Sequence, residues 1–222
     1  MDRTVIVTGA SGALGRAVVE RLRLDGIVVA AVDASPAFEI EADLMLPGVD
    51  LADEVAVGAA FDAVVAAFGT VNGLANIAGG FVWETVLGGQ PDAWNRMFRT
   101  NLLTAALASR AATPHLLERG GAIVNVGAAA AADPVAGMAP YAASKAGVMA
   151  LTRSLADELR GKGVRVNAVL PTILDTPANR RDMPDADPAE WIRPEHAADV
   201  VAFLLSDASV AVNGAGLTLA AS

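Results

Sequence analysis

The chain has 222 residues, 54% of them hydrophobic, and a formal net charge of −9; this length suits one large domain better than two small ones. The acidity is unfavourable for binding a nucleic-acid backbone, which needs a basic patch, and no apolar run approaches the roughly 20 residues that span a bilayer. The absence of cysteine excludes a disulfide framework and a thiolate nucleophile, and, together with an N-terminus that lacks a leader pattern, it predicts a cytoplasmic protein.

Short β-rich runs alternate with longer helical stretches along the chain. Strands are predicted at 4–8, 27–33, a weak segment ending near Asp50, 73–76, 122–126, 164–169 and 217–219. Helices are predicted at 13–24, 53–68, 91–117, 141–159 and 194–205. The strands are continuous apolar runs, as expected when both faces of a sheet are covered. The pattern predicts a single α/β domain, 1–222, with a Rossmann-type, doubly wound parallel sheet of about seven strands and helices on both faces.

Residues 172–194 interrupt this alternation with four prolines and clustered charge. The segment follows the predicted strand 164–169, so it leaves the sheet at the carboxyl edge, where ligands bind in such folds. Long loops inside compact domains are usually functional or disordered. We therefore expect a substrate lid here, with a merely flexible loop as the alternative.

A glycine-rich turn follows the first strand and leads into the first helix. In this turn Gly9 permits a tight bend, Gly12 lets the backbone approach a pyrophosphate, and Gly15 lets helix and strand pack closely. The N–H groups and dipole at the helix start favour phosphate. The candidate cradle consists of Gly9, Ser11, Gly12, Ala13, Leu14 and Gly15.

The second strand ends at Asp33, close to the distance downstream at which an acidic residue meets the adenosine ribose. A carboxylate there accepts hydrogen bonds from both ribose hydroxyls and repels a 2′-phosphate. Asp33 thus favours NAD(H) over NADP(H), although Arg16 could soften that preference. The alternative is an ordinary surface aspartate.

Tyr141 and Lys145 lie four residues apart in a predicted helix, which places the phenol and the ammonium on one face. A nearby ammonium stabilises a phenolate and lowers the pKa of the phenol from its usual value near 10. Such a pair can pass a proton to or from a substrate oxygen while hydride moves to or from a nicotinamide. The spacing alone is common by chance and needs support from other motifs.

Together the motifs resemble the short-chain dehydrogenase/reductase family over nearly the whole chain. They follow the family's order: Thr8-Gly9-…-Gly15, Asp50-Leu51, Asn76-Ile77-Ala78-Gly79, Asn101, Tyr141-…-Lys145 and Pro171-…-Thr176. The cofactor contacts that the resemblance implies are Asp50 and Leu51 for adenine, Asn76 to Gly79 for the cleft wall, Lys145 for the nicotinamide ribose, and the Pro171 motif with Thr176 on the carboxamide. It also implies that Asn101 holds a water in a proton relay with Lys145.

One position departs seriously from the family pattern. The family normally places a serine thirteen residues before its tyrosine, where Ala128 stands, and no Ser or Thr occurs between Thr113 and Ser144. Losing such a donor to a developing oxyanion costs on the order of 2.7–4 kcal/mol. An electron-poor, quinonoid or iminium-like acceptor needs less of this support. The chain is also similar to quinonoid dihydropteridine reductases, which resemble it in lacking this serine and in the lid sequence.

The remaining candidates are weaker. Phe81, Trp83, Trp191 and Ala128 are candidate substrate contacts, with packing as the alternative for the tryptophans. The two histidines lack carboxylate partners at ligand spacing, so no metal site is expected. The resemblance further implies that helices 91–117 and 141–159 form a homodimer or homotetramer interface.

The leading hypothesis is an NAD(H)-dependent oxidoreductase that transfers hydride between nicotinamide and a small carbonyl, quinonoid or imine-like substrate. In it Tyr141 is the acid/base, Lys145 its pKa modulator and Asn101 the relay support. The alternative is a non-catalytic NAD(H)-binding sensor or scaffold on the same fold, favoured by Ala128 and opposed by the intact Tyr141, Lys145 and Asn101.

Overall fold

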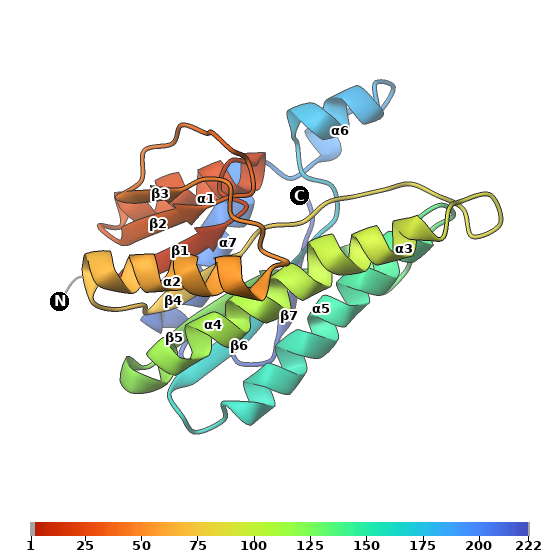
Figure 1. Cartoon of the computed structure of the whole chain (residues 1–222). Coiled ribbons are helices and arrows are strands. Elements are labelled where there is room, and N and C mark those ends of the chain that lie inside the picture. Colours follow the sequence, from red (N-terminus) through yellow and green to blue (C-terminus); the bar gives the residue numbers. More distant parts are fainter. Residues whose placement is uncertain (1–2, 222) are drawn as a thin grey trace.

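Seven parallel strands form one sheet in the computed structural model, which describes residues 3–221 (Figure 1). The strand order is β3-β2-β1-β4-β5-β6-β7. The strands are β1 (Thr4–Thr8), β2 (Val28–Val32), β3 (Leu44–Leu46), β4 (Gly73–Asn76), β5 (Gly121–Val126), β6 (Val164–Pro171) and β7 (Gly216–Leu219). The order reverses between β1 and β4, which creates the crevice at the carboxyl ends of the strands where doubly wound folds bind ligands.

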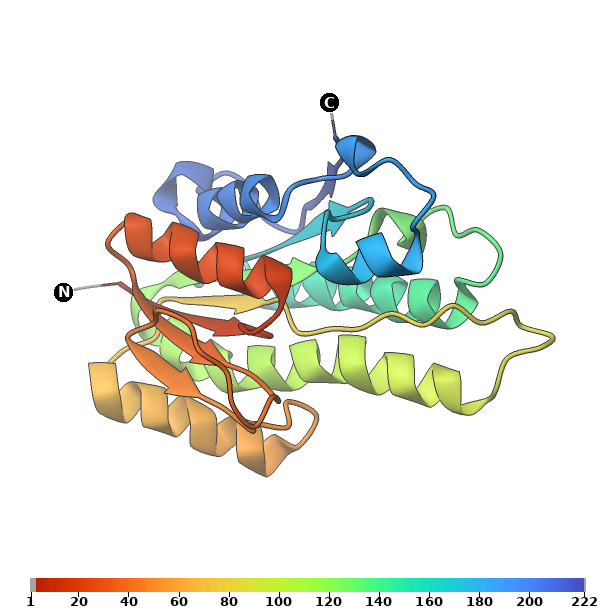
Figure 2. The same ribbon diagram turned by 90° about the horizontal axis from the view of Figure 1, so that it is seen from above.

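Helices cover both faces of this sheet (Figure 2). The helices α1 (Ala13–Leu24) and α7 (Pro194–Leu205) pack on one face. The other face is covered by α2 (Glu54–Phe68), α4 (Thr104–Arg119) and α5 (Ala139–Glu158). Val5, Ile6 and Val7 of β1 enter opposite cores in alternation, as strand geometry requires, and all three are apolar because both faces of the sheet are covered. The predicted fold class is confirmed.

Segment 91–117, predicted as one helix, contains three pieces. It consists of α3 (Asp92–Met97), a π-helix (η1, Phe98–Leu103) and α4, which continues to Arg119. Short π-helical turns inside α-helices are often found at functional sites. The apolar pattern does not reveal such a change in hydrogen-bond register, so sequence reasoning missed it.

The third strand ends at Leu46, four residues before the predicted end near Asp50. Pro47 has no N–H to donate to a ladder, and Gly48 adopts a φ of 71°, which turns the chain away. The loop then returns to the sheet, because the Val49 N–H donates to the Asp33 carbonyl at 3.0 Å.

Residues 172–194 contain more regular structure than their prolines indicate. They include α6 (Pro177–Asp182) and a 3₁₀ turn at Pro188–Glu190. The base of the segment is closed by backbone bonds from Asp175 N to Ile192 O (2.7 Å) and from Ile192 N to Ile173 O (2.8 Å). In Figure 1, α6 stands beyond the carboxyl edge of the sheet.

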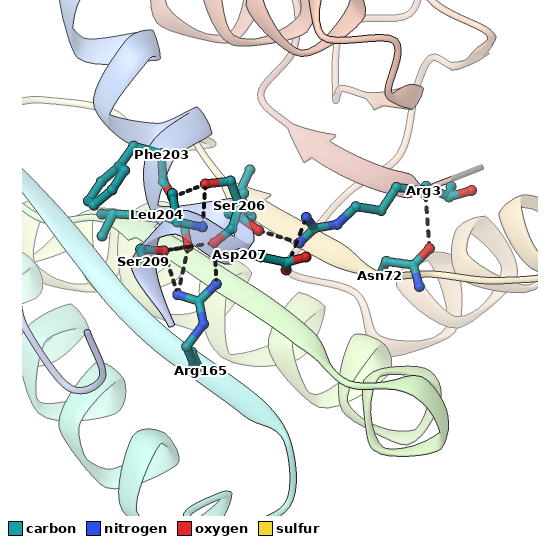
Figure 3. Close-up of polar contacts among 11 residues, drawn as sticks. Arg3, Asn72, Arg165, Phe203, Leu204, Ser206, Asp207 and Ser209 are labelled. Carbon is teal, nitrogen blue, oxygen red and sulfur yellow. Dashed lines mark hydrogen bonds and ion pairs between the residues drawn. The ribbon is translucent and has the colours of Figure 1, made fainter. Parts of the chain in front are cut away.

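Two arginines hold the C-terminus of α7 at the amino edge of the sheet (Figure 3). Arg165 donates to the carbonyls of Leu204 and Ser206, both at 2.9 Å, and Arg3 donates to the carbonyl of Leu205. These bonds satisfy helix-terminal carbonyls that lack an intrahelical partner. Both arginines line a cavity of about 790 Å³ at this edge. Their hydrogen bonds to the carbonyls at the end of α7 give them a structural role. Within residues 3–221, no helix is long and apolar enough to cross a membrane.

Candidate functional site

A cavity of about 600 Å³ opens at the carboxyl ends of β1, β2 and β4. Its lining includes most of the predicted cofactor residues: Gly9, Ser11, Gly12, Ala13, Leu14, Gly15, Asp33, Asp50, Leu51, Ala78, Gly79 and Thr176. Segment 172–194 also contributes Leu174, Pro177 and Ala178. Sequence reasoning missed Ala34, Ala52, Arg99, Thr100 and Thr104. The last three lie on or beside the π-helix, whose register was not readable from the apolar pattern.

The glycine turn brings bare backbone to the cavity wall. Gly9 has a φ of +65°, and a Cβ there would lie 2.6 Å from the Ala78 nitrogen. A Cβ on Gly15 would lie 2.1 Å from the Gly9 carbonyl oxygen. Gly12 is the residue before α1, and no side chain caps the helix start. The two outer glycines are therefore required by close packing, while the helix N-terminus stays open toward the cavity.

The carboxylate of Asp33 is bonded on both oxygens. It accepts from the Ser11 N–H and from the Ser35 N–H, both at 2.8 Å, and the residue is only 8% exposed. Arg16 donates to the carbonyls of Ser11 (2.8 Å) and Glu39 (2.7 Å). Asp33 is thus a hydrogen-bond acceptor held in a fixed position at the cavity wall, and the guanidinium of Arg16 is hydrogen-bonded to backbone carbonyl oxygens.

An ion pair spans the same wall. Arg99 Nη2 lies 2.7 Å from Asp50 Oδ2, and both side chains are more than half exposed. The backbone N–H of Ala52 and the Arg99 guanidinium hold the pKa of the Asp50 carboxyl below its usual range. The pair joins the loop after β3 to the π-helix.

Tyr141 and Lys145 project from the first turns of α5. Lys145 is 4% exposed, donates to the Val126 carbonyl at 2.7 Å, and lies 6.0 Å from the centre of the Tyr141 ring. Burial lowers the pKa of the Lys145 ammonium to about 8 and raises the pKa of the Tyr141 phenol to about 12. The structure thus contradicts the predicted lowering of the phenol pKa, because burial of the phenol outweighs the effect of the neighbouring ammonium. In this environment the ammonium and the neutral phenol are both present at neutral pH.

Asn101 and Lys145 meet at Gly79, which belongs to the cavity wall. A Cβ on Gly79 would lie 2.8 Å from Asn101 Oδ1 and 3.3 Å from Lys145 Nζ. The Asn101 amide accepts from the Gly80 N–H at 2.8 Å and donates to Ser144 Oγ at 2.9 Å. Two members of the predicted catalytic set, Asn101 and Lys145, therefore lie directly behind the cavity wall.

Four of the predicted cofactor residues are not among those that line the cavity: Tyr141 and Lys145, described above, and Asn76 and Pro171. The Asn76 amide nitrogen donates into a buried network, to Asn125 Oδ1 (2.8 Å) and Ser109 Oγ (3.0 Å). Pro171 ends β6, where it pairs with Leu219 of β7. Both are placed to support the strand ends from which the cavity is built.

The candidate substrate residues do not gather at one place. Phe81 meets the Tyr141 ring edge to face at 5.0 Å, and Trp83 packs on the backbone of Gly137, which leaves no room for a Cβ. Ala128 is 4% exposed at the end of β5. Trp191 is 5% exposed and lines a separate cavity of about 390 Å³. Phe81 is thus the aromatic residue in direct contact with Tyr141, and Trp191 lies apart from the main cavity.

Comparisons with known proteins agree with this arrangement. Residues 3–187 match the profile of the family described as short chain dehydrogenase. The chain belongs to this family. Short-chain dehydrogenases are oxidoreductases that use nicotinamide cofactors.

Individual short-chain dehydrogenases match over almost the full chain. A meso-2,3-butanediol dehydrogenase from Serratia marcescens is 32% identical, with 97% of this chain and 92% of that protein covered. An inactive 2-(S)-hydroxypropyl-CoM dehydrogenase 2 from Xanthobacter autotrophicus is 37% identical, covering 80% of this chain and 84% of that protein. The solved structure of ligand-free aldohexose dehydrogenase from Thermoplasma acidophilum superposes with a TM-score of 0.90 at 28% identity, covering 98% of this chain and 92% of that one.

Proposed function

We propose that this short-chain dehydrogenase is an NAD(H)-dependent enzyme that transfers hydride between the nicotinamide and a small organic substrate. The observation that carries the proposal is the arrangement around Gly79. This residue lines the cavity formed by the glycine turn, and a Cβ placed on it would lie 2.8 Å from Asn101 Oδ1 and 3.3 Å from Lys145 Nζ. One dinucleotide laid along the cavity would therefore reach from the glycine turn to the predicted reaction centre.

The residues present fit a dinucleotide. The close backbone packing at Gly9 and Gly15, and a start of α1 that has no side-chain cap among the described residues, suit a pyrophosphate. The cavity continues past Gly79 to the lid residues Thr176 and Pro177. When bound, the nicotinamide supplies the hydride acceptor or donor. The residues of the chain bind and orient the cofactor and the substrate, and they donate or accept the proton.

NAD(H) is the preferred cofactor in this proposal. Asp33 is a buried carboxylate at the cavity wall, and each of its oxygens has one lone pair left for a ribose hydroxyl after bonding Ser11 and Ser35. A 2′-phosphate at this place would meet the negative charge of Asp33. Arg16 is held by backbone carbonyls, so it offers little to offset that repulsion.

The proton step belongs to Tyr141. Burial keeps its phenol protonated at neutral pH, so in the reductive direction it donates that proton to the substrate oxygen or nitrogen. Lys145 favours the resulting phenolate through its charge. Asn101, fixed between Gly80 and Ser144, supports the return path of the proton.

The substrate is a small carbonyl, quinonoid or imine-like compound in this proposal. The named relatives are dehydrogenases of alcohols and sugars. Their names favour the interconversion of a carbonyl and an alcohol as the first reaction to test. Ala128 offers no hydroxyl to a developing oxyanion, which favours acceptors that delocalise the incoming charge. Residues 172–194 would form the substrate lid, and α4 and α5 the interface of a homodimer or homotetramer in the cytoplasm.

The test combines one variant with a substrate panel. Tyr141→Phe should reduce turnover by at least about 100-fold while leaving NADH affinity, measured by fluorescence titration, nearly unchanged. NADH oxidation should be faster with quinonoid dihydropterins, iminium compounds and quinones than with simple ketones. Equal turnover of the variant and the wild type removes Tyr141 from the mechanism, and rapid reduction of plain ketones contradicts the substrate argument.

A second function, a non-catalytic NAD(H)-binding sensor or scaffold, is favoured by one observation. Ala128 replaces the hydroxyl that the family pattern places beside the reacting oxygen, and one relative of 37% identity is named as inactive. Tight NADH binding without oxidation by any member of the panel would select this function over the first.

A further inference from the structure

We propose that Arg99 is a cofactor-binding residue that stacks on the adenine ring and sets the affinity for the adenosine half of the dinucleotide. The inference rests on the proposed function, because it assigns a role toward the cofactor that the proposal names. It concerns the ion pair Asp50–Arg99, which neither the proton step nor the glycine turn uses.

The position of the pair places it at the adenosine end of the cavity. Val49, the residue before Asp50, donates its N–H to the carbonyl of Asp33 at 3.0 Å, and Asp33 is the proposed ribose acceptor. Arg99 and Asp50 both belong to the cavity wall, together with Leu51. The reaction end lies elsewhere along the cavity, at Gly79.

The geometry of the pair suits an aromatic ligand. Asp50 Oδ1 accepts from the Ala52 N–H at 2.9 Å and its Oδ2 binds Arg99 at 2.7 Å, so the carboxylate is fixed and holds one edge of the guanidinium. A guanidinium held by its edge keeps its planar face for an aromatic ring. The Arg99 side chain is 55% exposed, and a bound adenine would cover part of that surface.

Arg99 also connects the two ends of the site through the chain. It lies in the same π-helix as Asn101, two residues away, and Asn101 is bonded to Gly80 and Ser144 at the reaction end. One short element therefore carries a residue for each half of the dinucleotide. The opposing hypothesis is an ordinary surface ion pair, which contributes little.

The chain offers a matched control for that hypothesis. Arg110 of α4 and Glu54, the first residue of α2, form an exposed ion pair at 3.0 Å, but neither residue lines the cavity. If exposed ion pairs between these elements matter only for the fold, Arg99→Ala and Arg110→Ala should behave alike.

The experiment measures binding by calorimetry for three probes: NADH, ADP-ribose, which has the adenosine but no nicotinamide, and reduced nicotinamide mononucleotide, which has no adenosine. Arg99→Ala should weaken NADH and ADP-ribose about tenfold and leave the mononucleotide unchanged. Arg99→Lys should lose most of the same affinity, since it keeps the charge but not the plane. Arg110→Ala should match the wild type for all three probes.

Four results overturn the inference. Wild-type affinities in Arg99→Ala, or an equal loss for NADH and the mononucleotide, exclude a role specific to adenosine while leaving the proposed function in place. Full affinity in Arg99→Lys excludes stacking. A wild-type protein that binds none of the probes removes the proposed function and this inference together.

Discussion

Lys145→Met should change the pH dependence of stability in a direction that the structure determines. Burial lowers the pKa of Lys145 from 10.5 to about 8, whereas the unfolded chain keeps the ordinary value. Between pH 8 and 10.5 the folded protein therefore binds fewer protons than the unfolded one, and its free energy of unfolding rises with pH. Below pH 8 the buried ammonium lowers that free energy by about 3 kcal/mol relative to high pH.

The assay is urea unfolding of both proteins from pH 7 to pH 10, analysed as the difference in unfolding free energy. From pH 7 to pH 10 the free energy of unfolding of the wild type should rise by about 2.5 kcal/mol relative to that of the methionine variant. The variant also loses the hydrogen bond to the Val126 carbonyl. This loss changes the difference in unfolding free energy by a constant amount and does not alter its dependence on pH. The range stops at pH 10 because the pKa of Tyr141, raised from 10 to about 12 by burial, changes its contribution above that value.

A control variant separates burial from charge. Lys162, the other lysine of the chain, is exposed, and Lys162→Met should leave the pH dependence of stability unchanged. A flat difference between the wild type and Lys145→Met would refute the reasoning, because it would mean that the ammonium is solvated in the folded protein and not confined behind Gly79.

Three further predictions concern the cavity wall. Gly15→Ala should destabilise the fold by about 2 kcal/mol, since its Cβ would meet the Gly9 carbonyl. Gly58→Ala, in an open part of α2, should stabilise the fold by about 0.5 kcal/mol. Thermal unfolding of both variants tests this, and equal melting temperatures would contradict it. Ala128→Ser should raise the turnover of simple ketones by about 100-fold or more, and unchanged rates would show that another donor already serves the oxyanion. Asp33→Ala should weaken NADH about tenfold with little effect on NADPH, and a constant affinity ratio between the two cofactors would place the ribose contact elsewhere.

Local patterns were sufficient to predict the layers of this protein. Strand centres such as Val5-Ile6-Val7 are apolar without alternation, and an element buried on both faces needs that composition wherever it lies in the chain. The spacing of the glycines at 9, 12 and 15 indicates a dinucleotide-binding turn only when it follows a strand and precedes a helix, and the local sequence predicts both elements. The resemblance to the family rested on these same short-range motifs, and the comparisons confirmed it.

Boundaries and partners depended on contacts between distant segments. The π-helix at Phe98–Leu103 is a change in backbone register, and no periodicity of apolar residues reveals it. The early end of β3 depended on Pro47 and Gly48, whose effect was outweighed in the prediction by the apolar residues around them. Trp191 was expected near the substrate on grounds of sequence position, yet it lines a separate cavity formed largely by its own segment.

By itself, the sequence determined the sheet, its two apolar cores, the bare glycine turn and the presence of Tyr141 and Lys145 on one helical face, since each of these follows from neighbours within a few residues. Only the tertiary structure decided that Asn101 and Lys145 both lie behind Gly79 and that Arg99 pairs with Asp50. The physical reason is that such contacts join segments dozens of residues apart, and their distances are set by how the helices pack on the sheet and not by any local preference of the chain.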